Sequence, residues 1–143
     1  MKILFKYADE TWTTNDEHRH TPLTYAVSNG QWEVARVLLE GGANIESTNA
    51  NGSTAVHCAA YFGHLDICRL LLDRGAKVDP LNNRTFTPLH EAAEQDHLAV
   101  AKLLVKRGAD VWVKTNNGQT ASDVARSQRN VNFADWLDSV SRG

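Results

Sequence analysis

The stretch Asn51-Gly52-Ser53-Thr54-Ala55-Val56-His57-Cys58-Ala59-Ala60 decides the fold, because its elements recur at a fixed interval along the chain. Its threonine returns at positions 21, 54, 87 and 120, a constant step of 33 residues. A Gly-Ala pair that begins at positions 42, 75 and 108 keeps the same step. A period of this length is typical of a stacked array, in which each unit buries its apolar face against its neighbours.

Two copies of the repeat are long enough to carry a family resemblance. The second copy continues from the opening stretch through Gly63-His64-Leu65 and Leu71-Leu72 to Gly75-Ala76, and the third contains Thr87-Pro88-Leu89-His90-Glu91-Ala92-Ala93. Over roughly residues 16 to 143 these motifs resemble the ankyrin-repeat family. The resemblance implies an all-α solenoid of stacked helix-turn-helix units with projecting β-turn or hairpin loops.

Apolar spacing and turn residues predict two helices in each copy. Gly63 and Gly75 are expected to end the two helices of the second copy, because a left-handed backbone costs little for glycine. Asp96 occupies the place that glycine fills at positions 30 and 63, so we expect a left-handed backbone there; a second interpretation is that Asp96 caps the next helix. The predicted helices are 21–28, 32–40, 54–61, 65–73, 87–94, 98–106, 120–127 and 131–139.

The length of 143 residues suits one domain, which we expect to span residues 1–143. The last predicted helix suits the solvent-exposed outer face of a capping repeat, because it carries the polar residues Asp135, Asp138 and Ser139. Residues 1–15 are either a natural N-terminal cap or the end of a preceding repeat in a longer array, and the sequence leaves both interpretations open. The expected units are a half-repeat or cap over 1–15, repeats over 16–48, 49–81 and 82–114, and a C-terminal capping repeat over 115–143.

Composition narrows the classes of partner. A net charge of −2 and a pI near 6.3 give no basic surface for phosphate backbones, so we expect no nucleic-acid binding. Two cysteines without a charged-then-apolar leader indicate an intracellular location, cytoplasmic or nuclear. The opening Met1-Lys2-Ile3-Leu4-Phe5 is too short for a membrane span. We therefore expect a monomer whose segment makes no membrane contact.

Residues with catalytic or metal-binding chemistry have structural explanations. The family resemblance implies that His57 and His90, one period apart, are hydrogen-bonded between adjacent repeats. Cys58, His64 and Cys68 add metal-capable side chains near His57, but no Cys-x-x-Cys pair starts a zinc site. No serine lies in a Gly-x-Ser-x-Gly context, and no glycine-rich phosphate loop is present. We expect no catalytic residue, metal or cofactor, and hence no enzyme.

The tryptophans divide into two groups. Trp32, Phe133 and Trp136 fall where the repeats otherwise carry aliphatic residues, so we expect them to fill the core. Trp112 instead follows Asp110-Val111 in a loop, where a large apolar side chain is unusual. It is therefore a candidate contact residue.

The resemblance implies that a partner protein is bound by the loop tips and the ends of the first helices. We expect a hot spot of Tyr61, Phe62 and Phe86 with Arg84 beside them, because the aromatics gather in repeats two and three. The alternative is that Phe86 packs on Leu81 and Tyr61 flanks the core. The predicted partner-binding residues are Asn51, Ser53, Tyr61, Phe62, Asn83, Arg84, Phe86, Glu94, Gln95, Trp112, Asn117 and Gln119.

Three functions fit this pattern. The first is a non-catalytic protein-binding module whose partner is another protein. The second is the recognition domain of a larger enzyme, ubiquitin-ligase adaptor or channel, since ankyrin arrays are often embedded in such proteins. The third is a small free-standing inhibitor, similar in size to the four-repeat inhibitors of cyclin-dependent kinases. Fold alone does not separate them.

Overall fold

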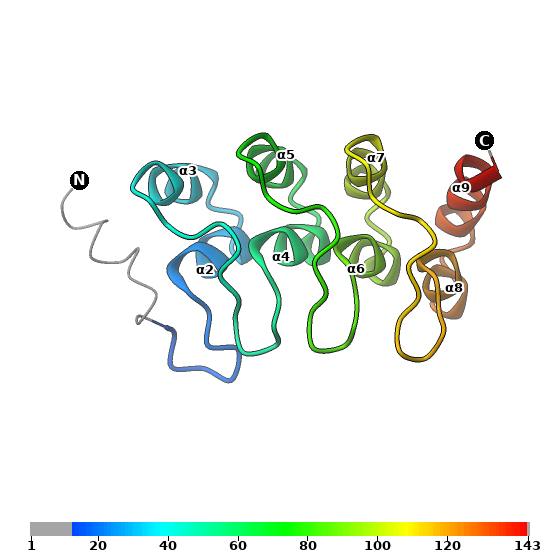
Figure 1. The fold of residues 1–143 in the computed structure, drawn as a ribbon, viewed down its shortest axis with the longest axis horizontal. Helices are drawn as coiled ribbons and strands as arrows, with labels where there is room; N and C mark the ends of the chain where they lie inside the picture. The colour runs from blue at the N-terminus through cyan, green and yellow to red at the C-terminus, as the bar shows by residue number, and fades with distance from the viewer. Residues whose placement is uncertain (1–12, 143) are drawn as a thin grey trace.

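The computed structural model describes residues 13–142, and all its regular elements are helices. The predicted all-α fold class is therefore confirmed, while the expectation for the half-repeat falls largely on residues 1–12, outside the described part of the chain. The helices form four pairs, and Figure 1 shows them in chain order. They are α2 (Pro22–Ser28), α3 (Trp32–Glu40), α4 (Ala55–Phe62), α5 (Leu65–Asp73), α6 (Pro88–Gln95), α7 (Leu98–Lys106), α8 (Ala121–Ser127) and α9 (Val131–Arg142).

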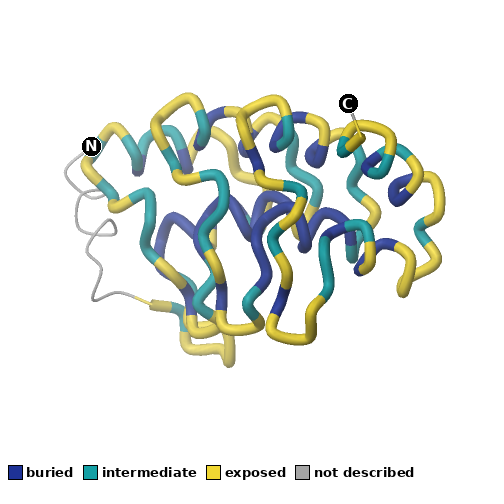
Figure 2. Tube along the Cα trace, turned by 45° about the vertical axis from the view of Figure 1, so that its right-hand side comes forward, coloured by how far each residue is buried: buried dark blue, intermediate teal, exposed yellow. Residues whose placement is uncertain are grey.

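The pairs stack into two rows of helices. The inner row consists of α2, α4, α6 and α8, the outer row of α3, α5, α7 and α9, and the connecting loops project beyond the inner row (Figure 1). Buried positions concentrate in the inner row (Figure 2). Ala59, Ala60, Ala92 and Ala93 are fully buried, because their small side chains let neighbouring inner helices approach closely. Within residues 13–142 no helix combines the length and apolar character needed to cross a bilayer.

The recurring threonine marks the start of each inner helix. Thr21, Thr54, Thr87 and Thr120 are N-caps with extended backbones, and each side chain accepts a hydrogen bond from the third residue of the following helix. The inner helices therefore begin one residue after each predicted start. An N-cap of this kind stabilises a helix by about 1 kcal/mol. The 33-residue step of the threonines is thus the step of the helix caps.

The inner helices are followed by a residue with a left-handed backbone. At the corresponding positions Gly30, Gly63, Asp96 and Arg129 have φ values of 70°, 74°, 61° and 63°. The expectation for Asp96 is confirmed. The second interpretation is wrong, because the N-cap of α7 is His97 and no side chain caps that helix. Glycine is therefore replaced in repeats three and four despite the backbone cost.

The next repeat decides whether a side chain fits at this position. A Cβ added to Gly63 would lie 2.6 Å from Nδ1 of His97, so any side chain there would require the histidine ring to shift. In repeat four the residue that corresponds to His97 is Asn130, whose shorter side chain donates to the carbonyl of Ala93 at 2.9 Å. The exchange of histidine for asparagine explains how Asp96 is accommodated.

The expected core aromatics are only partly confirmed. Phe133 is fully buried and Trp136 packs against the core, as predicted. The prediction for Trp32 is wrong, because its side chain is 39% exposed. The first position of each outer helix is incompletely covered, as Leu65 is only partly buried and Val131 is 53% exposed. A tryptophan at that position extends past its neighbours into solvent.

Candidate functional site

Three of the projecting loops, those before α4, α6 and α8, are each organised by one buried polar side chain at the base. The Oδ1 of Asn82 accepts backbone hydrogen bonds from Arg84 at 3.0 Å and Phe86 at 3.1 Å. Asn49 and Thr115 accept the equivalent pair of bonds in the neighbouring loops. Buried polar groups with satisfied bonds hold a loop in one conformation. The loop tips are therefore presented in a fixed arrangement.

Neighbouring loops are also bonded to one another. The backbone N–H of Asn83 donates to the carbonyl of Asn51 at 2.9 Å, and the amide of its side chain donates to Ala50 at 3.1 Å. Farther along, the N–H of Asn116 donates to Oγ1 of Thr85 at 2.8 Å. Asn51 and Asn83, two predicted contact residues, thus belong to one continuous row of loop tips.

The two repeated histidines connect the inner helices to the loops. His57 accepts from the N–H of Thr54 through Nδ1, and its Nε2–H donates to the carbonyl of Phe86 at 2.8 Å. His90 makes the same pair of contacts one repeat later, to Thr87 and to Gln119 at 3.1 Å. Burial lowers the pKa of His57 to about 4 and lowers that of His90, so both rings are neutral. Their predicted structural role between repeats is confirmed.

The surface between the inner helices and the loops, which we call the groove, contains a first cavity of about 410 Å³. Tyr61 and Phe62, at the end of α4, are 36% and 48% exposed at this cavity. Their rings meet edge-on with centroids 4.8 Å apart. The groove thus has an exposed aromatic pair at its centre. The first cavity is lined by His18, His20, Ser28, Asn49, Asn51, Ser53, His57, Cys58, Tyr61, Phe62, Asn82, Asn83, Arg84 and Glu91.

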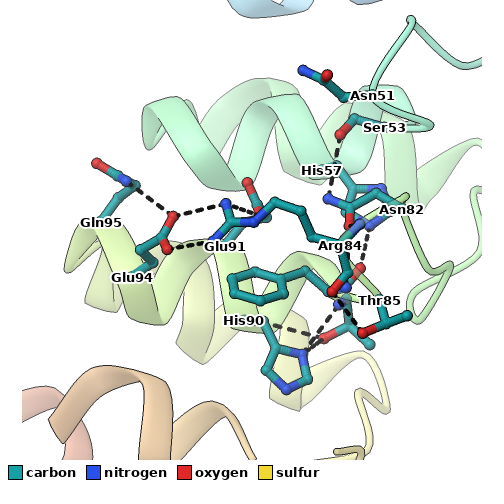
Figure 3. Close-up of polar contacts among 12 residues, drawn as sticks. Asn51, Ser53, His57, Asn82, Arg84, Thr85, His90, Glu91, Glu94 and Gln95 are labelled. Atoms are coloured by element: carbon teal, nitrogen blue, oxygen red, sulfur yellow. Dashed lines mark hydrogen bonds and ion pairs between the residues drawn. The ribbon is translucent and has the colours of Figure 1, made fainter. Parts of the chain in front are cut away.

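Arg84 is held in place by an acid and an aromatic ring. Its guanidinium donates to both carboxylate oxygens of Glu94, at 3.2 and 2.7 Å (Figure 3). It also lies over the ring of Phe86, 4.0 Å from the centroid. The bidentate bond to Glu94 raises the pKa of Arg84 and lowers that of the acid. Gln95 donates to the same carboxylate at 3.4 Å. The pair is solvent-exposed, so it fixes geometry more than it stabilises the fold.

The structure corrects the prediction that Phe86 faces solvent. Its side chain is only 7% exposed and belongs to the core, tilted against the ring of His90 at 5.3 Å and covered by Arg84. The reason is local, because the Asn82 bonds turn the loop back and carry residue 86 under the guanidinium. Leu81, the packing partner in the alternative, is 56% exposed. Phe86 is therefore buried in the core, as the alternative expected, while most of Leu81 is exposed.

The remaining predicted residues lie in a second cavity or apart from both. The second cavity, of about 330 Å³, brings Arg84, Phe86 and Glu94 beside the loop of repeat four. Trp112 lines neither cavity and is 64% exposed. The second cavity is lined by Arg84, Phe86, Glu94, Asn116, Asn117, Gln119, Val124, Ser127 and Gln128.

The cysteines are buried side chains of the inner and outer rows. Burial raises the pKa of Cys58 to about 11 and that of Cys68 to about 12, so both thiols are protonated at neutral pH. Across residues 13–142 no group of three His, Cys, Asp or Glu side chains is arranged to hold a metal ion.

Sequence reasoning missed Glu91 and the loop bases. Glu91 lines the first cavity with only 5% of the residue exposed. In the sequence Glu91 lies within the repeat motif. An acid at the position that Cys58 fills in repeat two could have marked it as unusual. Asn49 and Asn82 also keep the 33-residue step, which could have identified them as loop organisers.

Comparison with known proteins supports the same family. One family model, described as ankyrin repeats (3 copies), matches residues 41–115. A second model, described as ankyrin repeats (many copies), matches residues 7–59. The chain is similar to Arf-GAP with coiled-coil, ANK repeat and PH domain-containing protein 2, with 37% identity over 57 residues in Rattus norvegicus and Mus musculus and 35% in Homo sapiens. Each match covers 40% of this chain and 7% of the relative, so the chain spans a small part of these proteins. From its period, its stacked helix pairs and these matches, the chain belongs to the ankyrin-repeat family.

Proposed function

We propose that this chain binds another protein, without catalysis, through the groove of repeats two and three. Ankyrin repeats are in general protein-protein interaction modules. The observation that carries the proposal is the pair Tyr61 and Phe62, which line the first cavity and are partly exposed. Aromatic side chains beside a concave surface bury a large area against a partner and lose little rotamer freedom. The pair supplies the apolar centre of the interface.

The hydrogen-bonded frame around the pair supports this function. The loop base Asn82, the loop-to-loop bond of Asn83 and the bidentate Arg84 fix the groove before any partner arrives. A preorganised surface loses less conformational entropy on binding than a mobile one. We propose that Asn51, Ser53 and the exposed part of Arg84 form the rim of the interface.

Repeat four contributes the polar edge of the proposed interface. Asn117 and Gln119 lie in the second cavity beside Glu94, whose carboxylate is already bonded to Arg84. Polar side chains at the edge of an interface exclude water but contribute little to the binding energy. We therefore assign these residues, with Gln95, a smaller effect on affinity. Trp112 lies outside both cavities and forms a separate candidate contact.

The experiment compares Phe62→Ala with Gln128→Ala, which alters the corresponding exposed residue of repeat four. The wild-type chain captures proteins from a cell extract, mass spectrometry identifies them, and titration calorimetry measures the purified pair. Loss of the Phe62 ring should weaken binding by about 2 kcal/mol, which is about thirtyfold in Kd. Its melting temperature should hardly change, because the side chain is half exposed. Equal affinities for the two variants would place the interface elsewhere.

A second candidate is that the chain acts as the recognition segment of a longer protein. The observation that favours it is the similarity to Arf-GAP with coiled-coil, ANK repeat and PH domain-containing protein 2, whose name sets an ANK repeat beside other regions. The groove would then bring a partner to an activity located outside these residues. An immunoblot of the endogenous protein tests this proposal: a mass well above the 15.8 kDa of this chain supports it, and a mass equal to it favours the free-standing module or inhibitor.

A further inference from the structure

Glu91 places a carboxylate at a position where the same fold elsewhere uses apolar groups. The corresponding residues are Cys58 in α4 and Val124 in α8, which are 5% and 2% exposed, and Tyr25 in α2, which is 43% exposed. The side chain of Glu91 is 6% exposed, so this position is buried in repeats two to four and open only in repeat one. A position that needed only to be filled would favour an apolar residue. The acid therefore requires a separate explanation.

The Glu91 carboxylate has little compensation inside the protein. Its Oε1 is inaccessible to solvent and has no hydrogen-bond partner, while the nearest cation, Nη1 of Arg84, lies 3.7 Å away. That guanidinium is already bonded to both oxygens of Glu94 (Figure 3). Burial raises the pKa of Glu91 to about 7, against the opposing effect of Arg84. An incompletely paired buried charge destabilises the folded state, and nothing in the packing around Glu91 offsets that loss.

The surroundings of Glu91 match one kind of ligand. Both Glu91 and Ser28 line the first cavity, and Oγ of Ser28 is a second buried oxygen, whose polar neighbour is the thiol of Cys58. Tyr61 and Phe62 stand at the same cavity with exposed rings. Acceptor oxygens and aromatic rings that line the same cavity suit a positively charged head on an aliphatic stem. The charge of Arg84 is matched by Glu94, which leaves Glu91 as the excess charge of this group.

We propose that the first cavity receives one lysine or arginine side chain of the partner protein, with its cationic head facing Glu91 and Ser28 and its stem along Tyr61 and Phe62. The inference rests on the proposed function, because it assumes that a protein occupies the groove. A bound cation favours the ionised form of Glu91, so binding is tighter above its pKa than below it. The other ionisable groups that line the cavity or adjoin the acid are Arg84, Glu94, Tyr61, Cys58, His57, His18 and His20.

The test selects random linear peptides from a display library on the wild-type chain, and in parallel on Glu91→Gln and Ser28→Ala. On the wild-type chain we expect a basic residue enriched at one fixed position of the selected peptides. On Glu91→Gln this enrichment should be lost, although the neutral amide keeps the shape of the acid. Ser28→Ala should weaken the preference less, because a neutral hydroxyl contributes less to binding a cation than a carboxylate does.

A second measurement avoids any dependence on how the variants fold. In a selected peptide the basic residue is replaced by norleucine, which keeps the stem and removes the charge, and Kd is measured on the wild-type chain at about pH 6 and about pH 8, on either side of the Glu91 pKa of about 7. The charged peptide should bind about tenfold more tightly than the norleucine peptide at the higher pH, and the difference should shrink at the lower pH. Histidine-containing peptides are excluded, so that the probe itself does not titrate.

The outcomes separate this inference from the proposed function. Selected peptides that bind the groove without a basic residue, or that bind equally well with norleucine, would overturn the cation site and leave protein binding intact. A wild-type chain that selects no peptide at all would count against both.

Discussion

The junction between repeats two and three and the junction between repeats three and four share one framework but differ in what fills it. In the first, His57 donates to the carbonyl of Phe86 at 2.8 Å; in the second, His90 donates to Gln119 at 3.1 Å. The residues whose carbonyls accept these bonds differ in their side chains. Phe86 is buried under a guanidinium, whereas Gln119 lies partly exposed beside the second cavity. The backbone contacts repeat, whereas the side chains that they carry do not.

This difference shows where the sequence is free to vary for function. The histidine bonds and the loop bases use backbone atoms, so they tolerate any side chain at the loop tips. The inner helices vary as well: α4 and α6 place an aromatic pair and a buried acid around one cavity. The second cavity has a polar loop and no exposed aromatic pair. We therefore place the centre of binding at the first junction.

The largest expected change in stability comes from removing the side chain that packs at each junction. Phe86→Ala should destabilise the fold by about 3–5 kcal/mol, because it removes a buried ring and leaves a cavity beneath Arg84. Gln119→Ala, at the corresponding position, should change stability by less than about 0.5 kcal/mol. Urea unfolding followed by circular dichroism measures both. Similar losses for the two variants would show that the junctions are packed alike.

Glu91 provides the second contrast, because repeat four carries Val124 at the same position. Burial raises the folded-state pKa of Glu91 from 4.5 to about 7, so protonation supports the fold below about pH 4.5 and this support is lost as the pH rises through 7. Glu91→Gln should therefore match the wild type near pH 4.5 and exceed its stability at pH 8 by on the order of 2–3 kcal/mol. Titration of His57 occurs in both proteins and cancels in the difference. A stability difference that does not vary with pH would contradict the burial of an uncompensated acid.

Gly63 tests the packing of the histidine ring across the first junction. Gly63→Ala should cost about 1–2 kcal/mol from its left-handed backbone and more from the contact with His97, which lies 2.6 Å from the added Cβ. The matched control is Gly118→Ala, where φ is 78° and no atom lies within 4 Å of the added Cβ. The excess loss of the first variant over the second, read from their urea midpoints, isolates the histidine contact. Equal losses would show that the ring moves aside freely.

The smallest expected change in stability is at Asp96, in the second junction, where the reverse substitution introduces a glycine. Asp96→Gly should raise stability by about 0.5–1 kcal/mol, because glycine adopts the φ of 61° without strain. Arg129→Gly, at a φ of 63° in repeat four, should act in the same direction. An unchanged or lower urea midpoint for both variants would mean that the entropy of the unfolded chain outweighs the relief of strain.

Sequence reasoning recovered the parts of the fold that depend on local backbone chemistry. The threonine caps and the left-handed positions at 30, 63 and 96 have direct signatures, so the predicted helices lie close to the observed ones. Only α9 is clearly longer, ending at Arg142 rather than at residue 139. The role of His57 and His90 also followed the family resemblance and was confirmed.

The errors arise where neighbouring side chains decide the outcome. Phe86 looked like an exposed loop residue, because the sequence does not show that Asn82 turns the loop back or that Arg84 covers the ring. Trp32 looked like a core residue, although its position is incompletely covered in the other repeats too. Glu91 was concealed within a familiar motif. Each error concerns burial, which depends on residues distant in the sequence.

Hydrogen exchange of the backbone amides tests the central claim most directly, with and without a partner protein that the wild-type chain captures. The account predicts slower exchange in the loops at residues 49–53 and 82–86 and at the end of α4 around Tyr61 and Phe62, with little change in the outer helices α5 and α7. Slower exchange confined to the outer row or to α9, with these groove segments unchanged, would contradict it.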